Sequence, residues 1–187
     1  TRLRSFVNRA FTPRRVAVLE PQIREIAVRM IECMAPRGGG DWVADLAYDL
    51  PALVIFLLLG IPDCDVPNVK TWAQSRVQLN FGDLPEPDQV AHANNVVAYW
   101  RYCEALVEER FVQPGDDLPS DLVREYQRGD KSITKDEIAG LVFGQLTAGH
   151  ETTTGLLATG FLQLLRNREQ WEALCRDLGL ITNAVEE

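Results

Sequence analysis

The hydrophobic residues of this chain recur almost everywhere at helical spacing. The clearest run follows the order i, i+3, i+4, i+7, i+8 that lines one face of a helix, and it consists of Ile23, Ile26, Ala27, Met30, Ile31 and Met34. The same spacing predicts further helices before residue 12, over residues 68–79 and over residues 96–111. No segment keeps the apolar–polar alternation of a strand, so we predict an all-α protein of roughly eight helices.

Prolines and glycines mark where the predicted helices begin and end. Thr12 and Pro13 have the residue types of a helix cap and of a first helical position. The segment PRGGG, residues 36–40, ends the second helix. Residues 51–59 are nearly all apolar and short enough for a buried strand, but a proline at their start and Gly60 after them favour a buried helix. The remaining predictions are loops over 81–89 and 113–121 and a short helix over 120–129.

The longest predicted helix contains many glycines. It begins at a capping box, Thr134 to Glu137, and its apolar pattern continues to about Leu165. At about 1.5 Å per residue this helix is about 48 Å long. Its five glycines each cost about 0.8–1 kcal/mol relative to alanine: Gly140, Gly144, Gly149, Gly155 and Gly160. Close approach of a neighbouring helix is the favoured reason for Gly140, Gly144 and Gly160, whereas the middle of the helix needs another.

The segment LTAGHETTTG lies in that middle. One helical turn separates Ala148 and Gly149 from Thr152 and Thr153, so these residues are predicted to share a face. The result is a smooth notch edged by hydroxyl groups, with the carboxylate of Glu151 beside it. A threonine hydroxyl in a helix can bond the carbonyl four residues back, which bends the helix and opens carbonyl groups to water or a small ligand.

Other chemical motifs are incomplete. HETTT begins like the zinc-protease motif H-E-x-x-H, but Thr154 stands where the second histidine is needed, and His92 is the only other histidine. His150 is therefore interpreted as a helix-packing or surface residue. The cysteines lack metal-ligand spacing, so no metal site is predicted within this chain and each thiol is interpreted as reduced and buried: Cys33, Cys64, Cys103 and Cys175.

The composition narrows the possible partners. The 187 residues include 19 Lys and Arg and 27 Asp and Glu, and this net charge of -8 argues against nucleic acid, whose phosphates need a basic surface. The longest apolar run, Ala52–Leu59, has eight residues and is too short to cross a bilayer. No export signal is visible at the start. A cytoplasmic protein without membrane or nucleic-acid contacts is expected.

Several segments resemble one known family, in the family's own order. AGHETT, residues 148–153, resembles the oxygen-activating motif in the central helix of cytochrome P-450 haem-thiolate monooxygenases. The other similar segments are LRSFVNRAFTPRRV near the start, LPALVIFLLLGIP at 50–62, DDLPSDLV at 116–123 and NAVEE at the end. The similarity is to the soluble bacterial type, and it implies a mainly helical fold with a long central oxygen-binding helix.

The resemblance also implies a cofactor, haem b, and roles for individual residues. Glu151 and Thr152 take the places of the acid–alcohol pair that delivers protons to dioxygen, so they are the predicted catalytic residues. Ala148, Gly149 and Thr152 are expected to contact the haem. Arg4 takes the place of an arginine that holds a haem propionate.

Substrate and partners follow from the same resemblance. Gly144, Thr147 and Ala148 are expected to contact the substrate, a small organic molecule. O2 is the co-substrate, and a ferredoxin with its reductase is the expected electron donor. The identity of the substrate is not readable from the sequence.

The two ends of the chain favour a partial domain. Thr1 already lies in a predicted helix, and the chain stops after a helix start at Asn183. In the family pattern Glu187 takes the place of the structural glutamate of E-x-x-R, and the cysteine loop that binds iron follows later. The expectation is a single domain over residues 1–187, truncated at both ends, that does not form the haem-thiolate centre alone.

Two other kinds of function stay open on the sequence. A non-catalytic helical protein that binds haem or a hydrophobic ligand is the alternative if these residues are its natural full length. A purely structural helical bundle is a further alternative, although it leaves the notch and the order of the motifs unexplained.

Overall fold

A computed structural model of the chain describes residues 2–128 and 133–186. These residues form nine α-helices and no strand, which confirms the all-α prediction. The helices are α1 (Arg2–Ala10), α2 (Pro13–Met34), α3 (Asp49–Leu59), α4 (Val66–Phe81), α5 (Glu86–Val112), α6 (Leu118–Gln127), α7 (Lys135–Arg166), α8 (Arg168–Arg176) and α9 (Ile181–Glu186). Short helical turns complete the order: η1 (Ala35–Arg37), η2 (Val43–Ala47) and η3 (Leu178–Leu180). None of the described helices is long and apolar enough to cross a membrane.

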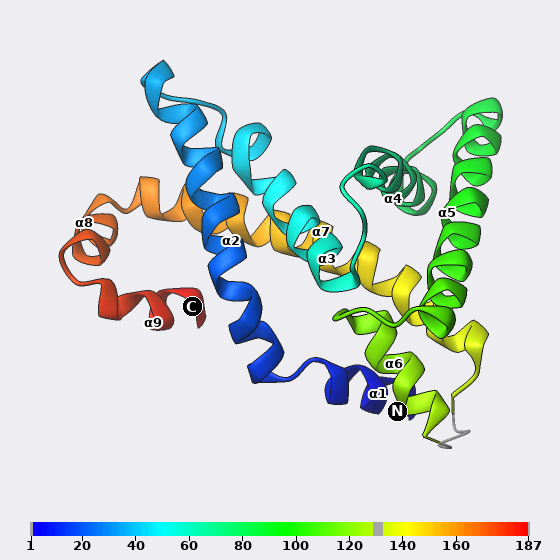
Figure 1. Ribbon diagram of the computed structural model, residues 1–187. Coiled ribbons are helices and arrows are strands. Elements are labelled where there is room, and N and C mark those ends of the chain that lie inside the picture. Colours follow the sequence, from blue (N-terminus) through cyan, green and yellow to red (C-terminus); the bar gives the residue numbers. More distant parts are fainter. Residues whose placement is uncertain (1, 129–132, 187) are drawn as a thin grey trace.

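The long helix α7 crosses the whole molecule and organises the other helices (Figure 1). Helix α2 lies to one side and α4 and α5 lie to the other, with α3 between them. Helices α1 and α6 lie at the beginning of α7, and α8 and α9 lie at its end. Helix α3 packs along α7, while α5 packs against α4, α6 and α7.

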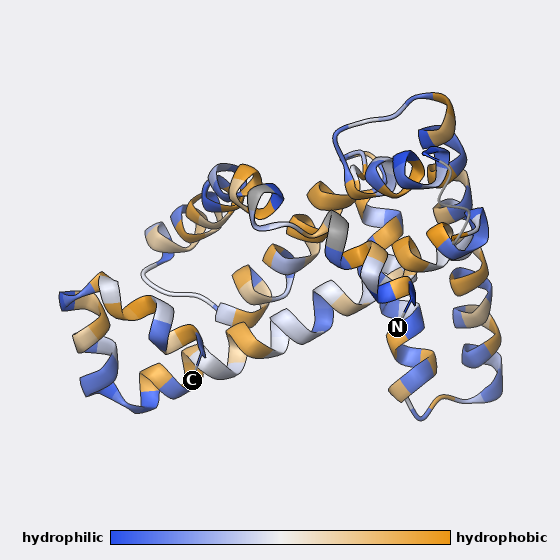
Figure 2. Cartoon of the chain, turned by 90° about the horizontal axis from the view of Figure 1, so that it is seen from below, coloured by the Kyte–Doolittle hydropathy of each residue, from blue (hydrophilic) through white to orange (hydrophobic). Residues whose placement is uncertain are grey.

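The core forms where α3, α5, α6 and the first half of α7 meet. Its largest fully buried side chains include Tyr99, Leu59, Leu118, Leu122, Ile138 and Leu146. The buried positions of α7 end at Thr154, and beyond it Leu156, Leu162 and Leu165 are exposed. In Figure 2 the long helix is pale along its middle, because glycine and threonine are neither strongly hydrophobic nor strongly hydrophilic. The middle of α7 therefore joins a buried half to an exposed half.

The caps predicted at Thr12 and Thr134 are present. The Thr12 hydroxyl accepts the backbone N–H of Arg15 at 3.2 Å, and Pro13 is the first residue of α2. At the start of α7, Thr134 Oγ1 accepts the Glu137 N–H at 3.2 Å, and the Glu137 carboxylate accepts the Thr134 N–H at 2.8 Å. These reciprocal bonds confirm the capping box and fix where α7 begins.

A buried ion pair holds the end of α3. The apolar run is a buried helix, as predicted, and Gly60 ends it in the left-handed conformation with φ 64°. Arg110, in the last turn of α5, donates from Nε to Asp117 Oδ2 at 2.6 Å and from Nη2 to the Gly60 carbonyl at 2.9 Å. The other oxygen of Asp117 caps α6 by accepting the Ser120 N–H at 2.8 Å. Arg110 is 8% exposed and Asp117 is 4% exposed, so this ion pair is buried. Three helix ends meet at it.

Two predicted loops are shorter than expected. Helix α5 begins at Glu86, so the prediction of a loop through residues 81–89 is wrong for its last part. Helix α6 begins at Leu118, inside the second predicted loop. In both cases a proline, Pro87 or Pro119, stands in the first helical turn, where its missing N–H has no helical acceptor to lose. Proline at these positions marks the start of a helix and not the continuation of a loop.

The other differences concern the cysteines and the last helix. Cys103 is buried, but the prediction of buried thiols is wrong for the exposed residues Cys33, Cys64 and Cys175. Helix α9 begins at Ile181, so Asn183 lies inside it and is not its cap. Glu187, and residue 129 at the predicted end of the short helix, lie outside the described residues.

Candidate functional site

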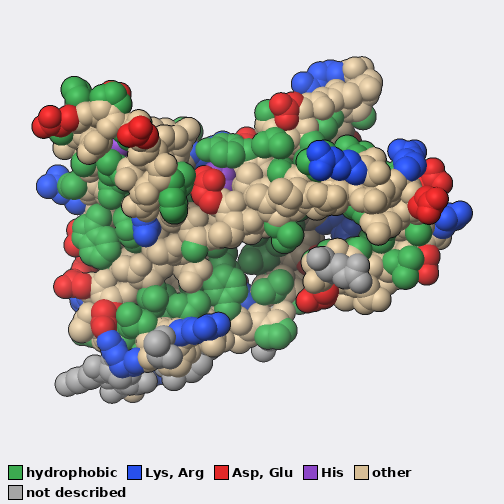
Figure 3. Space-filling model, turned by 180° about the vertical axis from the view of Figure 1, so that it is seen from behind, with side chains coloured by type: hydrophobic (Ala, Val, Ile, Leu, Met, Phe, Trp, Pro, Cys, Tyr) green, Lys and Arg blue, Asp and Glu red, His purple; other side chains and the backbone are tan. Residues whose placement is uncertain are grey.

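One face of α7 is open and carries little side-chain bulk. Ala148 and Thr152, one turn apart, are both exposed. Gly144 and Gly155 lie on the same side, and a Cβ added at either would have nothing within 4 Å. Seen from behind, the surface is hollowed near the centre of the molecule (Figure 3). A flat ligand can therefore approach the backbone of α7 closely along this face.

The Thr152 hydroxyl is bound to its own helix. It donates to the Ala148 carbonyl oxygen at 2.8 Å, which is the bond to the carbonyl four residues back that a threonine in a helix can make. This bond uses the hydroxyl proton and leaves the oxygen lone pairs available to a donor on the open side. To donate to a ligand, Thr152 has to release the carbonyl.

Glu151 lies beside the open face and is not hydrogen-bonded to Thr152. Its Oε1 lies 3.8 Å from Nδ1 of His150, which is too far for a hydrogen bond. Burial raises the pKa of Tyr48, and the nearby charge of Glu151 raises it further. Among the described residues no hydrogen bond joins Glu151 to Thr152, so the half-exposed carboxylate is free to exchange protons with water.

His150 is a packing residue, as predicted. It is buried, its Nε2 lies 2.7 Å from the Tyr48 carbonyl oxygen, and its ring meets the Tyr48 ring edge-on with centroids 4.7 Å apart. Further along α7, Trp42 donates from Nε1 to the Leu157 carbonyl at 3.1 Å and stacks on Phe161. These contacts hold η2, an element that the sequence did not predict, against α7.

Gly149 faces a different side of the helix from Ala148. A Cβ at this position would lie 2.8 Å from Cδ1 and 3.0 Å from Cγ1 of Ile55 on α3. The prediction that residues 148, 149, 152 and 153 share one face is therefore wrong, because α3 covers the Gly149 side. Close packing was expected instead at Gly140, Gly144 and Gly160. Only Gly140 has a neighbour within 4 Å among the described residues, the ring of Trp100.

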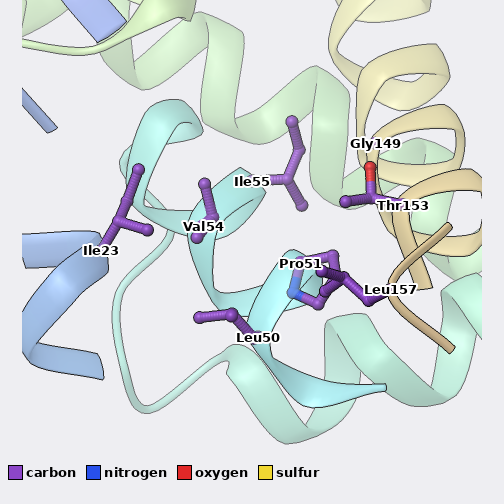
Figure 4. A pocket seen from close by; sticks show the side chains of 8 residues that line it. All are labelled: Ile23, Leu50, Pro51, Val54, Ile55, Gly149, Thr153 and Leu157. Carbon is purple, nitrogen blue, oxygen red and sulfur yellow. The ribbon is translucent and has the colours of Figure 1, made fainter. Parts of the chain in front are cut away.

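A pocket of about 270 Å³ opens between α2, α3 and α7. Its lining is apolar except for the hydroxyl of Thr153, and it consists of Ile23, Leu50, Pro51, Val54, Ile55, Gly149, Thr153 and Leu157 (Figure 4). Glu151 and Thr152 do not line it. The pocket is thus a groove for an apolar group, and the polar chemistry of the motif lies on another side of α7.

Arg4 lies exposed on α1, and within the described part of the chain it has no carboxylate partner. Helix α1 is fixed to the first turn of α7 by Arg2, whose guanidinium binds the carboxylate of Glu137. This hydrogen bond lowers the pKa of Glu137. Residues 137 and 152 are about 22 Å apart along a helix axis. A ligand that contacts both Arg4 and Thr152 therefore has to extend along α7.

Thr147 lies on the side of α7 that faces α4. Arg76 of α4 donates from Nη1 to Thr147 Oγ1 at 2.9 Å and to the Phe143 carbonyl at 3.2 Å. Sequence reasoning missed Arg76, although a signal was present. In the order i, i+3, i+4, i+7 it follows Val69, Trp72 and Ala73, so a cation stands on the apolar face of its helix.

Comparison with known proteins decides the family, although no family model matches the sequence. The cytochrome P450 monooxygenase PikC of Streptomyces venezuelae is 39% identical over all of this chain and 44% of its own length. Vitamin D(3) 25-hydroxylase of Pseudonocardia autotrophica is 34% identical, with coverages of 100% and 45%. The structure of cytochrome P450 CREJ in complex with (4-ethylphenyl) dihydrogen phosphate matches with a TM-score of 0.89 and 42% identity, over 97% of this chain and 45% of that one. This chain belongs to the cytochrome P450 family.

Family membership confirms the resemblance drawn from AGHETT and from the order of the other segments. The P450 chain spans about half the length of these relatives, 44% of PikC and 45% of the hydroxylase. The helix that carries AGHETT is α7, the longest of the described helices. The roles predicted for its residues, and for Arg4 and Glu187, stay predictions.

Adding a methyl group at Gly149 tests whether packing on α3 is what requires glycine there. We expect overpacking in Gly149→Ala to cost about 1–3 kcal/mol of stability. The better helix propensity of alanine should offset about 1 kcal/mol of that cost. In an Ile55→Val background, which removes Cδ1 and keeps Cγ1, the cost should become smaller. The measurement is the free energy of unfolding of this P450 in urea.

Gly160→Ala is the matched control for that cycle, because its Cβ would meet nothing within 4 Å. It should stabilise the protein by up to about 1 kcal/mol. Equal effects at the two glycines, or a cost at Gly149 that Ile55→Val leaves unchanged, would contradict the packing role.

Proposed function

We propose that this P450 chain supplies the oxygen-activation helix, and part of the haem and substrate pocket, of a monooxygenase that inserts one oxygen atom of O2 into a small organic substrate. The observation that supports the proposal most is the open face of α7. There Ala148 and Thr152 of AGHETT are exposed, in a chain 39% identical to a cytochrome P450 monooxygenase. The activity is that of the enzyme that contains these 187 residues.

The residues of α7 fit a haem on the open face. A flat macrocycle needs a helix face without bulky side chains, and this face offers the methyl group of Ala148 and the side chain of Thr152 between two unobstructed glycines. Gly149 faces Ile55, so we expect it to reach the haem through its backbone.

The thiolate that holds the iron is expected outside these residues. Burial raises the pKa of the Cys103 thiol to about 12, which disfavours the thiolate form that binds metals. The other cysteines are exposed and lie apart in the sequence. The described residues include no group of three His, Cys, Asp or Glu side chains placed to hold a metal ion.

The catalytic contribution of this chain is proton delivery. When bound, the haem supplies the redox chemistry that activates O2. Thr152 exchanges its bond to the Ala148 carbonyl for one to the reacting oxygen and passes a proton to it. Glu151 is half-exposed and is not hydrogen-bonded to Thr152. It takes protons from water and restores the proton of the Thr152 hydroxyl.

The substrate is expected to lie beside the same helix. Gly144 and Ala148 border the open face, and Thr147 lies at the α4 side of it. A ferredoxin with its reductase is proposed as the electron donor. The cytoplasmic location expected from the sequence stays a prediction.

Replacing Arg4 tests the haem site without turnover. In the haem-loaded enzyme, Arg4→Ala would leave a propionate without its charge-assisted partner, at a cost of about 1.5–3 kcal/mol in haem retention. We expect haem to pass faster to an acceptor such as apomyoglobin. The Soret band of the reduced carbon monoxide complex should first establish thiolate ligation in the wild type.

Arg24→Ala is the control, because Arg24 is an exposed arginine of α2 that pairs with Glu20 of the same helix. Its haem transfer rate should equal that of the wild type. Equal rates for Arg4→Ala and Arg24→Ala would remove Arg4 from the haem site, and the absence of a thiolate-type band would refute the proposed function itself.

A further inference from the structure

A half-buried polar cluster lies where α4, α5 and α7 meet. We call it the Arg76 cluster, and it comprises Arg76, Tyr99, Phe143 and Thr147. The guanidinium carbon of Arg76 lies 4.2 Å from the centroid of the Phe143 ring. The Tyr99 ring packs on the same Phe143 ring, with centroids 4.8 Å apart. Arg76 Nη1 donates to the Thr147 hydroxyl and to the Phe143 carbonyl. These contacts hold the guanidinium in one orientation against α7.

Arg76 has no carboxylate partner among the described residues, and this separates it from other partly buried cations. The comparable pairs are Arg15–Asp116, Lys70–Asp49, Arg110–Asp117 and Arg124–Asp121. Acidic residues are plentiful in a chain of net charge -8. A partly buried cation is stabilised further by a nearby anion, so the missing carboxylate leaves a place for an anion from outside the chain.

The donors of the guanidinium are not exhausted. A guanidinium has five N–H donors in a planar fork, and the two protein acceptors of Arg76 are both served by Nη1. Nε and Nη2 have no acceptor in the described part of the chain. Arg76 is only half-buried, so this edge can receive the two oxygens of an oxyanion.

Tyr99 supplies an independent observation. Its side chain is fully buried, and among the described residues its hydroxyl has no hydrogen-bond partner of normal geometry. Burial raises the pKa of Tyr99, while Thr147 and the charge of Arg76 act in the opposite direction, which places the phenol next to both. No hydrogen bond of normal geometry joins the Tyr99 and Thr147 hydroxyls. A buried donor without an acceptor costs about 1–3 kcal/mol, and a bound oxyanion can remove that cost.

The cluster adjoins the proposed site of oxygen activation. Thr147 directly precedes Ala148 in α7 and lies one turn before Glu151. A molecule anchored at Arg76 on the α4 side of α7 would extend around the helix to bring its remaining atoms beside Ala148 and the open face. The group bound at Arg76 would then lie to one side of the position proposed for oxygen activation, where it can select the substrate without taking part in the reaction.

We propose that Arg76 binds an oxyanion group of the substrate, a carboxylate or a phosphate monoester, and so selects organic acids with an apolar body. That the bound molecule is a substrate rests on the proposed function. Thr147 and Tyr99 complete the oxyanion site as neutral hydroxyl groups. Neutral molecules of the same shape leave the guanidinium edge unpaired and bind more weakly.

The test is equilibrium dialysis of the haem-loaded enzyme that contains these residues. The probes are para-propylbenzoate and para-propylphenyl phosphate, with para-propylbenzamide as the neutral analogue. The wild type should bind at least one oxyanion more tightly than the amide. Arg76→Gln should weaken that oxyanion about 10- to 100-fold and change the amide by less than about twofold. Arg76→Lys should restore part of the loss, because it keeps the charge without the fork.

Arg101→Gln is the matched control, because it removes the same charge from an exposed position on α5. It should leave the binding of all three probes unchanged. Equal weakening of acid and amide by Arg76→Gln would show that Arg76 only joins α4 to α7. No weakening, or no oxyanion preference in the wild type, would also overturn the proposal. If the preference is found but the reduced enzyme forms no oxygenated product, the proposed function fails while the oxyanion site stands.

Discussion

Replacing Thr152 by alanine should uncouple the enzyme, so that hydrogen peroxide is released in place of oxygenated product while NADH or NADPH is still consumed. The hydroxyl is exposed on the open face of α7 and is the group that we assign to proton delivery. Positioned acid–base groups contribute about 10²–10⁴ in rate, which leaves ample room for the effect. The measurement is the ratio of peroxide to product per reduced cofactor consumed.

The fold should tolerate this substitution. In the described part of the chain, the Thr152 side chain bonds the Ala148 carbonyl of its own helix at 2.8 Å and no other group, and alanine is the better helix former. Haem content and unfolding should therefore stay at or slightly above the wild-type level. Glu151→Gln should differ by slowing O2 consumption itself, because it removes the group that renews the proton.

The chain offers a matched control one residue further on. Thr153→Ala removes the same hydroxyl from a residue that lines the apolar pocket beside α3. It should leave the ratio of peroxide to product unchanged. If Thr152→Ala also gave the wild-type ratio, Thr152 would be a packing residue and the catalytic assignment would be lost.

Removing the buried carboxylate of Asp117 should cost about 3–5 kcal/mol of stability. Asp117→Ala leaves the buried guanidinium of Arg110 with the exposed carboxylate of Glu109, 3.1 Å from Nη1, as its ion-pair partner, and it also removes the N-cap of α6. The Gly60 carbonyl that Arg110 holds would lose its fixed partner as well. The ends of α3 and α5 and the start of α6 are thus released together. The measurement is the unfolding free energy in urea.

Asp116→Ala is the control for this result. Asp116 is the neighbouring carboxylate, but it is 88% exposed and pairs with Arg15 at 2.9 Å on the surface. Its removal should cost about 0–1 kcal/mol. Similar losses for the two substitutions would mean that the buried pair does not stabilise the junction of the three helices.

The sequence by itself determined the course of most helices and the identity of the motif. The capping box at Thr134, the left-handed glycine after α3 and the bond from Thr152 to Ala148 were all predictable. Each depends on residues within about four positions of one another along the chain. The order of the family-like segments was equally readable, because it requires no knowledge of how distant helices pack.

The tertiary structure decided which residues of the motif face which surroundings. Helix α3 covers Gly149 and leaves Ala148 exposed, so two neighbouring small residues have different roles. Arg76 meets Thr147 across 71 positions of sequence. Helical periodicity states which residues share a face, but not which helix covers that face. That choice depends on packing between helices far apart in the chain, and therefore only the folded molecule contains it.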